Sequence, residues 1–410
     1  MKENSKIPPH WQIKKLGEVC DVLDNLRKPI NSDERKKRIS GKAENELYSY
    51  YGATGQVGWI DDYITDGEYI LVGEDGAPFL DIFKEKAYKI KGKTWVNNHA
   101  HILKGKERML SNDFVLYYLN SINYIDYVNG TTRLKLTKSS LMDIDFILPP
   151  LPEQHLIVSK IEELFSELDK GVENLKTAQQ QLKVYRQSLL KAAFEGKLTN
   201  KYVKEGELPE GWKWVKVGDI CKCIVPNRDK PKTFTGDIKW VTTPNLKQNS
   251  ISLDYNNIAL GLTEEEALQY NARVIPTGSV VMTCVGTFGL SAVVQKPIVI
   301  NQQLHAFISN ELINSKYLAY CIQNNKHFFE KKSTSTTIQY LNKENCNSMP
   351  LPLCKIEEQN QIVQILESKL TICDKIEETI AQSLQQAETL RQSILKKAFE
   401  GELVEYVIEN

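Results

Sequence analysis

The chain carries one series of motifs twice, and this duplication limits its fold more than any other feature of the sequence. Four segments recur in the same order, and they are 7–20 with 208–221, 131–138 with 336–343, 153–164 with 358–369, and 191–198 with 396–403. The offset grows from 201 to 205, so the second copy has gained four residues in its middle. Solenoid repeats have periods of about 20–50 residues, which is far shorter. The sequence therefore predicts a tandem duplication of one domain and one helix.

The helix of each copy follows a proline-rich stop, "ILPPLPEQ" in the first copy and "MPLPLCKIEEQ" in the second. From 152 to 194 and from 357 to 399, apolar residues recur every seven positions, as in a coiled coil. This seam consists of Ile161, Leu168, Leu175, Leu182 and Leu189, and of Leu366, Cys373, Ile380, Ala387 and Ile394. Gly196 and Gly401 are expected to end the helices. We expect the two helices to pair antiparallel; the alternative is that each packs on its own domain.

The segments between the helices have mixed α/β (α+β) character. "EYILVG" and "SVVMTCVG" have the composition of buried strands, and 111–122 and 314–325 have that of matching amphipathic helices. The predicted organisation is a first domain (1–151), a helical spacer (152–200), a second domain (201–355), a second spacer (356–404) and a tail (405–410). Because the copies match, we expect a pseudo-two-fold arrangement.

Bulk composition sets broad limits on function. Lys plus Arg and Asp plus Glu both total 52, so net charge is zero and any binding to nucleic acid would need a local patch. No apolar run is long enough to span a membrane and no signal peptide is visible, which favours the cytoplasm. The eight cysteines are scattered, so we interpret them as buried free thiols.

Catalytic motifs are missing from the sequence. It contains no GxxxxGK[ST] loop, no Asn/Asp-Pro-Pro-aromatic tetrapeptide, no GxSxG, no HExxH and no metal-ligand spacing. Glu195-Gly196-Lys197 could be half of a nuclease site, but its repeat partner ends in Glu402 and loses the lysine. Glu34-Arg35-Lys36 lies in a stretch that we interpret as a charged loop. We expect no catalytic residue and no metal site in this chain.

Polar and basic residues recur at equivalent places in both copies. Lys and Arg neutralise phosphates, while Asn, Gln, Thr and Arg can address base edges. The candidate DNA-binding residues of the first copy are Arg27, Lys28, Arg35, Lys36, Lys37, Arg38, Lys42, Tyr50, Asn97, Asn98, Thr131, Thr132 and Arg133. Those of the second are Arg228, Lys230, Lys232, Lys239, Trp240, Thr242, Asn245, Lys247, Asn301, Gln302, Gln303, Ser333 and Thr334. Solvated loops and ordinary turn chemistry are the alternative explanation.

The whole chain resembles the specificity subunit of type I restriction-modification systems. The residues that carry this resemblance are the paired W-x(5)-G-[ED]-[VI]-C openings, "GEDGAPF", "WVNNHAHIL", "GTTRLKL", "LPPLPEQ" with "EEQNQIV", and the paired "AFEG[KE]L" endings. The resemblance implies two target recognition domains that each read half of a bipartite double-stranded DNA target. It also implies that the helices separate the domains and dock two modification subunits.

The resemblance further implies which subunits supply the chemistry. The modification subunits would form an adenine-N6 methyltransferase that uses S-adenosylmethionine. Restriction subunits would add ATP-dependent and Mg-dependent cleavage, so that this chain itself needs no cofactor. Rival interpretations are the recognition subunit of a type IIB-like system, a stand-alone sequence-specific DNA-binding protein, a coiled-coil scaffold that binds no DNA, and a single-chain enzyme.

Overall fold

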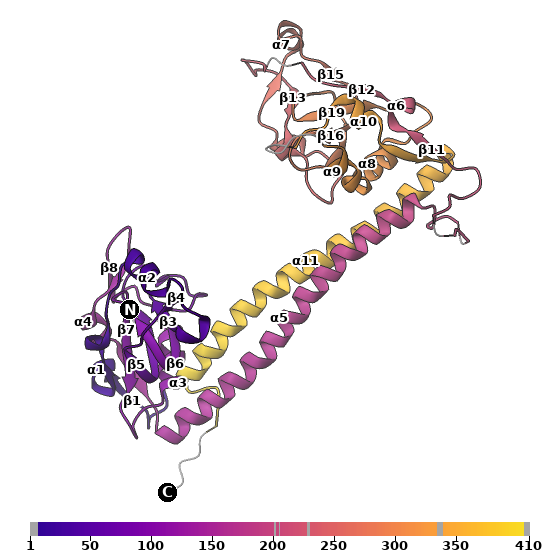
Figure 1. The fold of residues 1–410 in the computed structure, drawn as a ribbon. Helices are drawn as coiled ribbons and strands as arrows, with labels where there is room; N and C mark the ends of the chain where they lie inside the picture. Colours follow the sequence, from indigo (N-terminus) through magenta and orange to yellow (C-terminus); the bar gives the residue numbers. More distant parts are fainter. Residues whose placement is uncertain (1–6, 201, 205, 228–229, 334–338, 406–410) are drawn as a thin grey trace. The chain divides into compact units, whose positions relative to one another are not determined.

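The structure is a computed structural model that describes residues 7–200, 202–204, 206–227, 230–333 and 339–405. The chain divides into two compact units, one of residues 1–177 with 380–410 and the other of residues 178–379. Each unit contains one globular region and one end of each long helix (Figure 1). The five-segment division made from the sequence stays a prediction.

The first globular region holds short helices and a six-stranded sheet of order β2-β7-β5-β6-β3-β4. Its strands are β1 (Gln12–Lys15), β2 (Cys20–Val22), β3 (Tyr48–Gly52), β4 (Gly55–Ile60), β5 (Thr65–Gly73), β6 (Ala87–Val96), β7 (Ala100–Gly105), β8 (Val128–Asn129), β9 (Lys135–Leu136) and β10 (Asp145–Leu148). Its helices are α1 (Leu16–Val19), α2 (Ser32–Ile39), α3 (Asn112–Ser121) and α4 (Lys138–Met142), with 3-10 turns Asp24–Leu26 and Glu44–Glu46. β3 and β6 run parallel, while the other pairs in this sheet are antiparallel.

The second globular region divides the corresponding strands between two four-stranded sheets, of order β12-β19-β16-β17 and β14-β13-β18-β15. Its strands are β11 (Lys213–Lys216), β12 (Lys222–Ile224), β13 (Ile238–Val241), β14 (Gly261–Leu262), β15 (Val274–Ile275), β16 (Val280–Thr283), β17 (Ser291–Val293), β18 (Ile298–Ile300), β19 (Leu304–Ile308) and β20 (Pro350–Leu353). Its helices are α6 (Val217–Ile220), α7 (Glu264–Gln269), α8 (Ser315–Asn324), α9 (Lys326–Lys332) and α10 (Lys343–Asn347), with 3-10 turns Thr243–Asn245 and Tyr255–Asn257. β13 and β18 are the parallel pair here.

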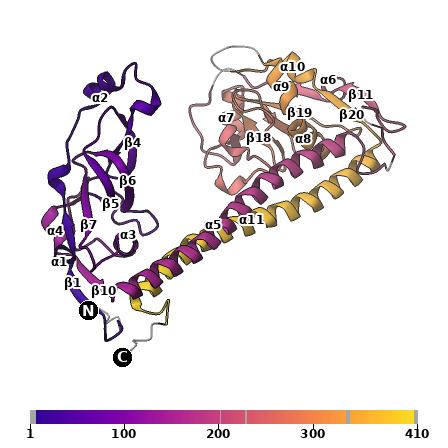
Figure 2. The ribbon, with the colours of Figure 1, turned by 60° about the horizontal axis from the view of Figure 1, so that its bottom comes forward.

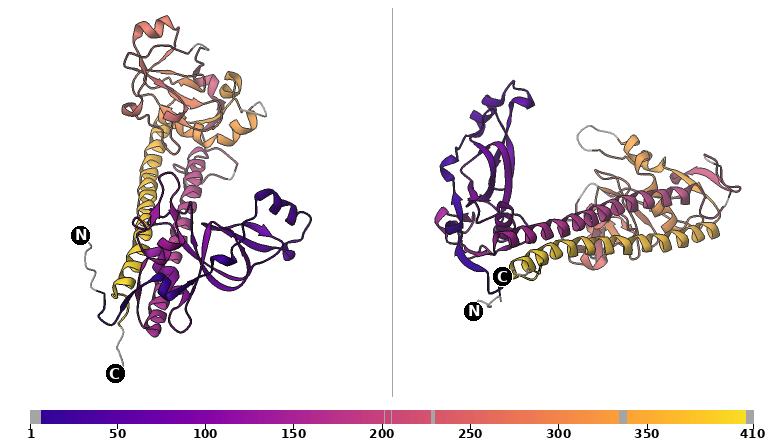
Figure 3. Two further views of the ribbon diagram at one scale, coloured as in Figure 1. Left: turned by 90° about the vertical axis from the view of Figure 1, so that its left-hand side faces the viewer. Right: turned by 90° about the horizontal axis from the view of Figure 1, so that it is seen from below.

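The two long helices are confirmed as α5 (Leu151–Phe194) and α11 (Ile356–Glu400). Within each unit their segments lie side by side, as Figures 2 and 3 show. Their direction is antiparallel in both units, because the start of one helix packs with the end of the other. Of the seam positions, Ile161, Leu182, Leu189, Leu366, Cys373, Ile380, Ala387 and Ile394 are buried, and Leu168 and Leu175 are half-buried.

Equivalent ion pairs join the helices in both units. The Arg186 Nη2 atom lies 2.5 Å from Asp374 Oδ1 and 3.2 Å from Glu377 Oε2. In the other unit Arg391 pairs with Asp169, and its guanidinium stacks 4.2 Å from the centre of a phenylalanine ring on α5. Asp169 and Asp374 are repeat equivalents, as are the two arginines. The duplication therefore reproduces the pairing of the helices as well as their sequence.

Each globular core includes the start of its own helix and the end of the other copy's helix. In the first unit the core contains Ile157 from α5 and Phe399 from α11. In the second unit it contains Ile362 from α11 and Phe194 from α5. Each helix thus packs on its own domain at its start, as the alternative interpretation proposed, but it also pairs with the other helix.

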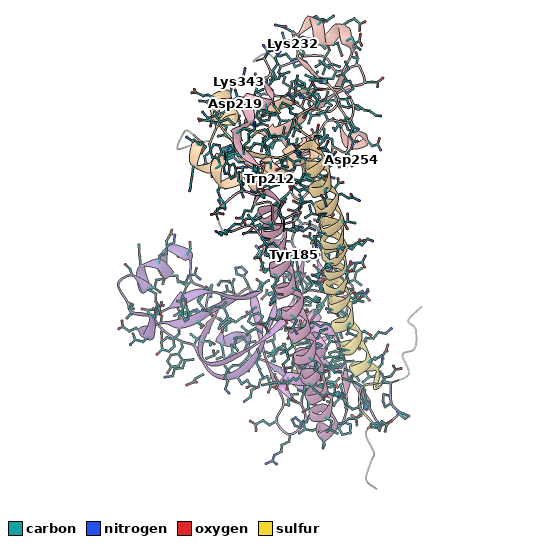
Figure 4. All side chains as sticks on the ribbon, turned by 90° about the vertical axis from the view of Figure 1, so that its right-hand side faces the viewer. Tyr185, Trp212, Asp219, Lys232, Asp254 and Lys343 are labelled. Atoms are coloured by element: carbon teal, nitrogen blue, oxygen red, sulfur yellow. The ribbon has the colours of Figure 1, made fainter. Side chains whose placement is uncertain are left out.

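The repeated "AFEG" ending meets the repeated P-x-x-W opening. Gly401 has φ +79°, and a Cβ atom there would lie 2.3 Å from Pro8 Cγ. Gly196 has φ +74°, and a Cβ atom there would lie 2.2 Å from Pro209 Cγ. Trp212, labelled in Figure 4, lies in this corner of the second unit. Glycine is required at both helix ends because the backbone is left-handed and a proline ring fills the space of a side chain.

A glutamine in each Pro-rich stop ties the start of the long helix to its globular region. Gln154 accepts from the Ser111 backbone N–H (3.0 Å) and donates to the Met109 carbonyl (3.0 Å). Its repeat equivalent, Gln359, bonds residues 314 and 312 in the same way (2.9 and 3.0 Å). Both glutamines are fully buried, so these bonds satisfy amides that would otherwise be costly to bury.

One local prediction is wrong. Residues 31–42 were expected to form a charged loop, but Ser32–Ile39 form helix α2. Asn31 caps the helix by accepting from the Glu34 backbone N–H at 2.8 Å. None of the helix residues is buried, so the apolar stripe that would have marked it in the sequence is missing. The eight cysteines, in contrast, are all free and buried, as expected.

Candidate nucleic-acid interface

The amide-rich segments of both copies follow the second strand of a parallel pair. Asn97 comes directly after β6, and its backbone N–H donates to the Tyr51 carbonyl of β3 at 3.1 Å. Asn301 comes directly after β18, and its backbone N–H donates to the Val241 carbonyl of β13 at 3.1 Å. The same long-range strand pairing therefore places the two segments equivalently.

In the second region this segment lines a depression of about 320 Å³. Seven residues line it, and they are Asn227, Lys230, Trp240, Thr242, Asn301, Gln302 and Gln303. All except Asn227 were candidates from the sequence. Polar groups from three separate stretches of chain thus converge beside the Trp240 ring, which is itself buried against an apolar cluster. The polar groups suit contact with phosphates and base edges.

The amides in and beside this depression are held by hydrogen bonds. Thr242 donates to Asn245 Oδ1 from its backbone N–H (2.8 Å) and its hydroxyl (3.0 Å). Asn301 Nδ2 donates to Gln303 Oε1 (3.2 Å), and the Gln303 backbone N–H donates to Asn301 Oδ1 (3.1 Å). Gln302 Nε2 donates to the Asn227 carbonyl at 3.4 Å. The side chains are therefore oriented before any ligand arrives.

In the first region acidic residues bring together the candidates near the equivalent segment. Asp75 Oδ1 lies 2.8 Å from both His99 Nδ1 and Arg133 Nη2. Glu74 pairs with Arg27 and, at 3.0 Å, with Lys135 Nζ. Asn98, which precedes His99, is exposed, and so are Thr131 and Thr132, which precede Arg133. Asn97 is buried, and its Oδ1 atom accepts from the His99 backbone N–H.

Glu74 and Asp24 have lowered pKa values, and their charge reduces the free positive charge of this face. Burial opposes ionisation of Glu74, but hydrogen bonds from Arg27 and Lys135 outweigh it and lower the pKa of this carboxyl. Burial likewise opposes ionisation of Asp24, while the hydrogen bond and charge of His101 and the charge of Arg27 lower its pKa. Arg27 is therefore neutralised by two carboxylates and is less available to a phosphate than its position in a basic stretch indicated.

The basic residues of 28–42 divide into anchors and outward-facing groups. Arg35 stacks on the buried Tyr50 ring at 4.6 Å, and Lys28 and Arg38 lie 5.5 and 5.1 Å from the Trp95 ring centre. Asp61 binds two basic residues of this stretch, Arg38 (2.6 Å) and Lys42 (2.8 Å). Lys36 and Lys37 are exposed and have no carboxylate within 4 Å among the described residues. These two lysines are the best phosphate-binding candidates on α2.

Other candidates lie apart from the depression. Lys239 lies on β13 and lines a different depression with Lys296, and Lys247 is exposed after the 3-10 turn Thr243–Asn245. Lys232 is exposed, and Figure 4 shows it at the end of this region farthest from the helices. Ser333 ends α9, where its hydroxyl donates to the Glu330 carbonyl. Arg228 and Thr334 lie outside the described residues.

Sequence reasoning missed several residues of these faces. His99 was inside the quoted "WVNNHAHIL" motif but was not chosen, and Glu74 and Asp75 were inside "GEDGAPF". Asn227 and Thr243 flanked chosen residues. For Glu74 and Asp75, the signal available in the sequence was their negative charge. Its role becomes clear only when their arginine and histidine partners are known.

Neither a metal site nor a membrane span is found in the described part of the chain. Its His, Cys, Asp and Glu residues form no group of three or more that could hold a metal ion. In the same described residues, no helix is both long enough and apolar enough to cross a bilayer.

Two similarly built regions, each with a polar face and both connected by paired helices, define a tandem-domain architecture. A model of the family described as "Type I restriction modification DNA specificity domain" matches residues 8–177 and again residues 209–386. The chain therefore belongs to this family, and it is a type I restriction-modification specificity subunit with two tandem recognition domains that recognise DNA sequence. Specificity subunits are non-catalytic and act together with other restriction-modification subunits.

Individual relatives agree with this assignment. The putative type I restriction enzyme specificity subunit S.HindORF215P of Haemophilus influenzae is 28% identical over 398 residues, covering 92% of this chain and 91% of that protein. The EcoBI specificity subunit of Escherichia coli is 27% identical over 321 residues, covering 70% of this chain and 64% of that one.

Solved structures share the fold. A chain from a study of assembly and conformational transition in a type I restriction-modification system has a TM-score of 0.73, with 18% identity and coverage of 97% of this chain and 99% of that one. The HsdS subunit of Thermoanaerobacter tengcongensis has a TM-score of 0.58, with 19% identity and coverage of 97% and 98%.

Proposed function

We propose that each recognition domain of this subunit reads one half of a bipartite double-stranded DNA target, and that α5 and α11 set the spacer between the halves. The family match at both copies carries this proposal. The two domains place polar segments directly after equivalent strands, but the residues of these segments differ, with Asn-Asn-His at 97–99 and Asn-Gln-Gln at 301–303. Domains that diverged in this way would read different half-sites.

We also propose that the helices dock two modification subunits, which carry S-adenosylmethionine and methylate adenine N6. Restriction subunits that use ATP and Mg would complete an endonuclease. Neutral net charge supports a division of labour, because partner subunits would then provide part of the phosphate contact. Eight reduced, buried cysteines are consistent with work in the cytoplasm.

The spacer proposal is tested by shortening both helices together. The ion pairs Arg186–Asp374 and Arg391–Asp169 define which positions face each other, so residues 172–178 and 382–388 are deleted as a matched pair. Seven residues correspond to about 10.5 Å of helix, or about three base pairs. Methylome sequencing of cells that also express the modification subunit should show a spacer about three base pairs shorter, with unchanged half-sites. Altered half-site bases would contradict the proposal.

The half-site proposal is tested by replacing residues 1–150 with the first domain of another specificity subunit. Only one half-site should change, and a change in both would refute the proposal.

A stand-alone DNA-binding protein, the main rival, would retard a specific duplex in a gel without any partner subunit. A type IIB-like system is distinguished by a single partner that both cuts and methylates.

A further inference from the structure

The side chain of Gln303 is exposed at the mouth of the depression in the second recognition domain. It follows β18 by three residues, and its backbone carbonyl accepts from the Cys284 N–H at 2.9 Å. This bond fixes the backbone from which the side chain extends. An amide here can present either its oxygen or its NH₂ group to a ligand, and the two ends read opposite partners.

The surrounding hydrogen bonds decide which end faces outward. A backbone N–H can only donate, so the atom of Asn301 that lies 3.1 Å from the Gln303 N–H must be its oxygen. The other atom of this amide is then Nδ2, a donor, and the Gln303 atom 3.2 Å from it must be Oε1. The Thr243 hydroxyl also donates to Gln303 Oε1 at 3.2 Å. With its oxygen held twice, the exposed Gln303 side chain has an NH₂ group with no hydrogen-bond partner among the described residues, so this group is available to a ligand.

We propose that Gln303 is a specificity-determining residue, whose Nε2 donates to an acceptor on a base edge of the half-site read by the second domain. In the major groove such acceptors are purine N7, guanine O6 and thymine O4, whereas cytosine offers only its N4 amino donor. Asn301 is the positioning residue that keeps Gln303 in this orientation. The inference rests on the proposed function, because it needs the second domain to read a half-site.

The matched position of the first domain is held in the same way but carries a histidine. Asn97 Oδ1 accepts from the His99 backbone N–H at 2.8 Å, as Asn301 does from Gln303. His99 Nδ1 lies 2.8 Å from a carboxylate oxygen of Asp75, which cannot donate, so the imidazole proton is on Nδ1. One scaffold thus places a glutamine amide in one copy and an imidazole in the other.

The test uses the full-length chain co-expressed with its modification subunit, and single-molecule sequencing of the host DNA. Gln303→Glu replaces the donor by an acceptor of the same shape. Asn301→Asp retains the acceptor for the Gln303 N–H, but its second oxygen draws the Gln303 NH₂ inward and turns Oε1 outward. Both variants should lower methylation of the wild-type motif about tenfold or more, and both should shift one position of one half-site toward cytosine or adenine.

Gln295→Glu is the matched control, because it adds the same charge to an exposed glutamine of the same domain outside the depression. It should leave the motif unchanged. Binding to duplexes with each of the four bases at each half-site position completes the test. A Gln303→Glu complex that keeps the wild-type motif, or that loses affinity equally for every duplex, would overturn the inference. A wild-type complex that methylates no bipartite motif would instead overturn the proposed function.

Discussion

Replacing the last phenylalanine of each long helix should destabilise the domain of the other copy. Phe399 is 5% exposed, and its ring lies 5.3 Å from Phe114 and 5.1 Å from Tyr118, both in edge-on contact on α3 of the first domain. Buried Phe→Ala substitutions cost about 3–5 kcal/mol. Phe399→Ala should therefore raise hydrogen-exchange rates of the first domain's core amides about 10²- to 10⁴-fold. Phe194→Ala should do the same in the second domain, where its ring lies 5.1 Å from Tyr317.

Peptide-resolved hydrogen exchange by mass spectrometry separates the two domains in one experiment. Leu390→Ala serves as the control, because this residue lies on the same segment of α11 but is 51% exposed. It should change the free energy of opening by less than about 1 kcal/mol. The reasoning is refuted if Phe399→Ala releases amides of residues 209–355 and leaves the first domain protected. That outcome would mean that each helix stabilises only the domain that precedes it.

Three further predictions test separate parts of the structure. Gly401→Ala should lower stability by about 2–4 kcal/mol in thermal unfolding, since φ is positive and the Pro8 ring fills the space, whereas Gly171→Ala, in open space on α5, should raise it by about 0.5–1 kcal/mol. His305 is fully buried, and burial lowers its pKa to about 4, so the stability gained from keeping it neutral is complete above pH 6.5 and lost as pH falls to 4. Urea titrations of the second domain should lose up to roughly 3 kcal/mol over that range, and His305→Leu should flatten the dependence. Arg186→Leu should cost less than about 1 kcal/mol in the same assay, because it removes two ion pairs together with two buried guanidinium nitrogens that have no hydrogen-bond partner in the described part of the chain. A loss above about 3 kcal/mol would contradict this.

The duplication, both long helices and their antiparallel pairing could be predicted because they depend on periodicity, which is local in sequence. Helix α2 could not, because Arg35 and Arg38 hold it to the sheet by stacking on Tyr50 and Trp95. Cations over aromatic rings leave no apolar stripe in the sequence. The packing of Phe399 on the first domain was also hidden, since nothing in a heptad pattern says which core receives the last turn.

The candidate site was predictable in composition but not in geometry. Lys230, Trp240, Thr242 and the amides of 301–303 were identified by residue type, and the parallel pairing of β13 with β18 then brought them together. Which charged residues are free to contact DNA could not be predicted in the same way. Arg27 looks free in sequence and is neutralised in the structure by Asp24, three residues earlier, and by Glu74, which lies in a distant part of the chain.

The corner where a proline and a tryptophan meet a glycine-ended helix has a consequence for evolution. Both helices end in the same "AFEG" tetrapeptide, and both domains open with the same P-x-x-W spacing, so either ending fits either opening. An exchange of the middle of one domain would then need no compensating change in the helix that receives it. Such a shared joint would let recombination replace one domain while the other stays as it is.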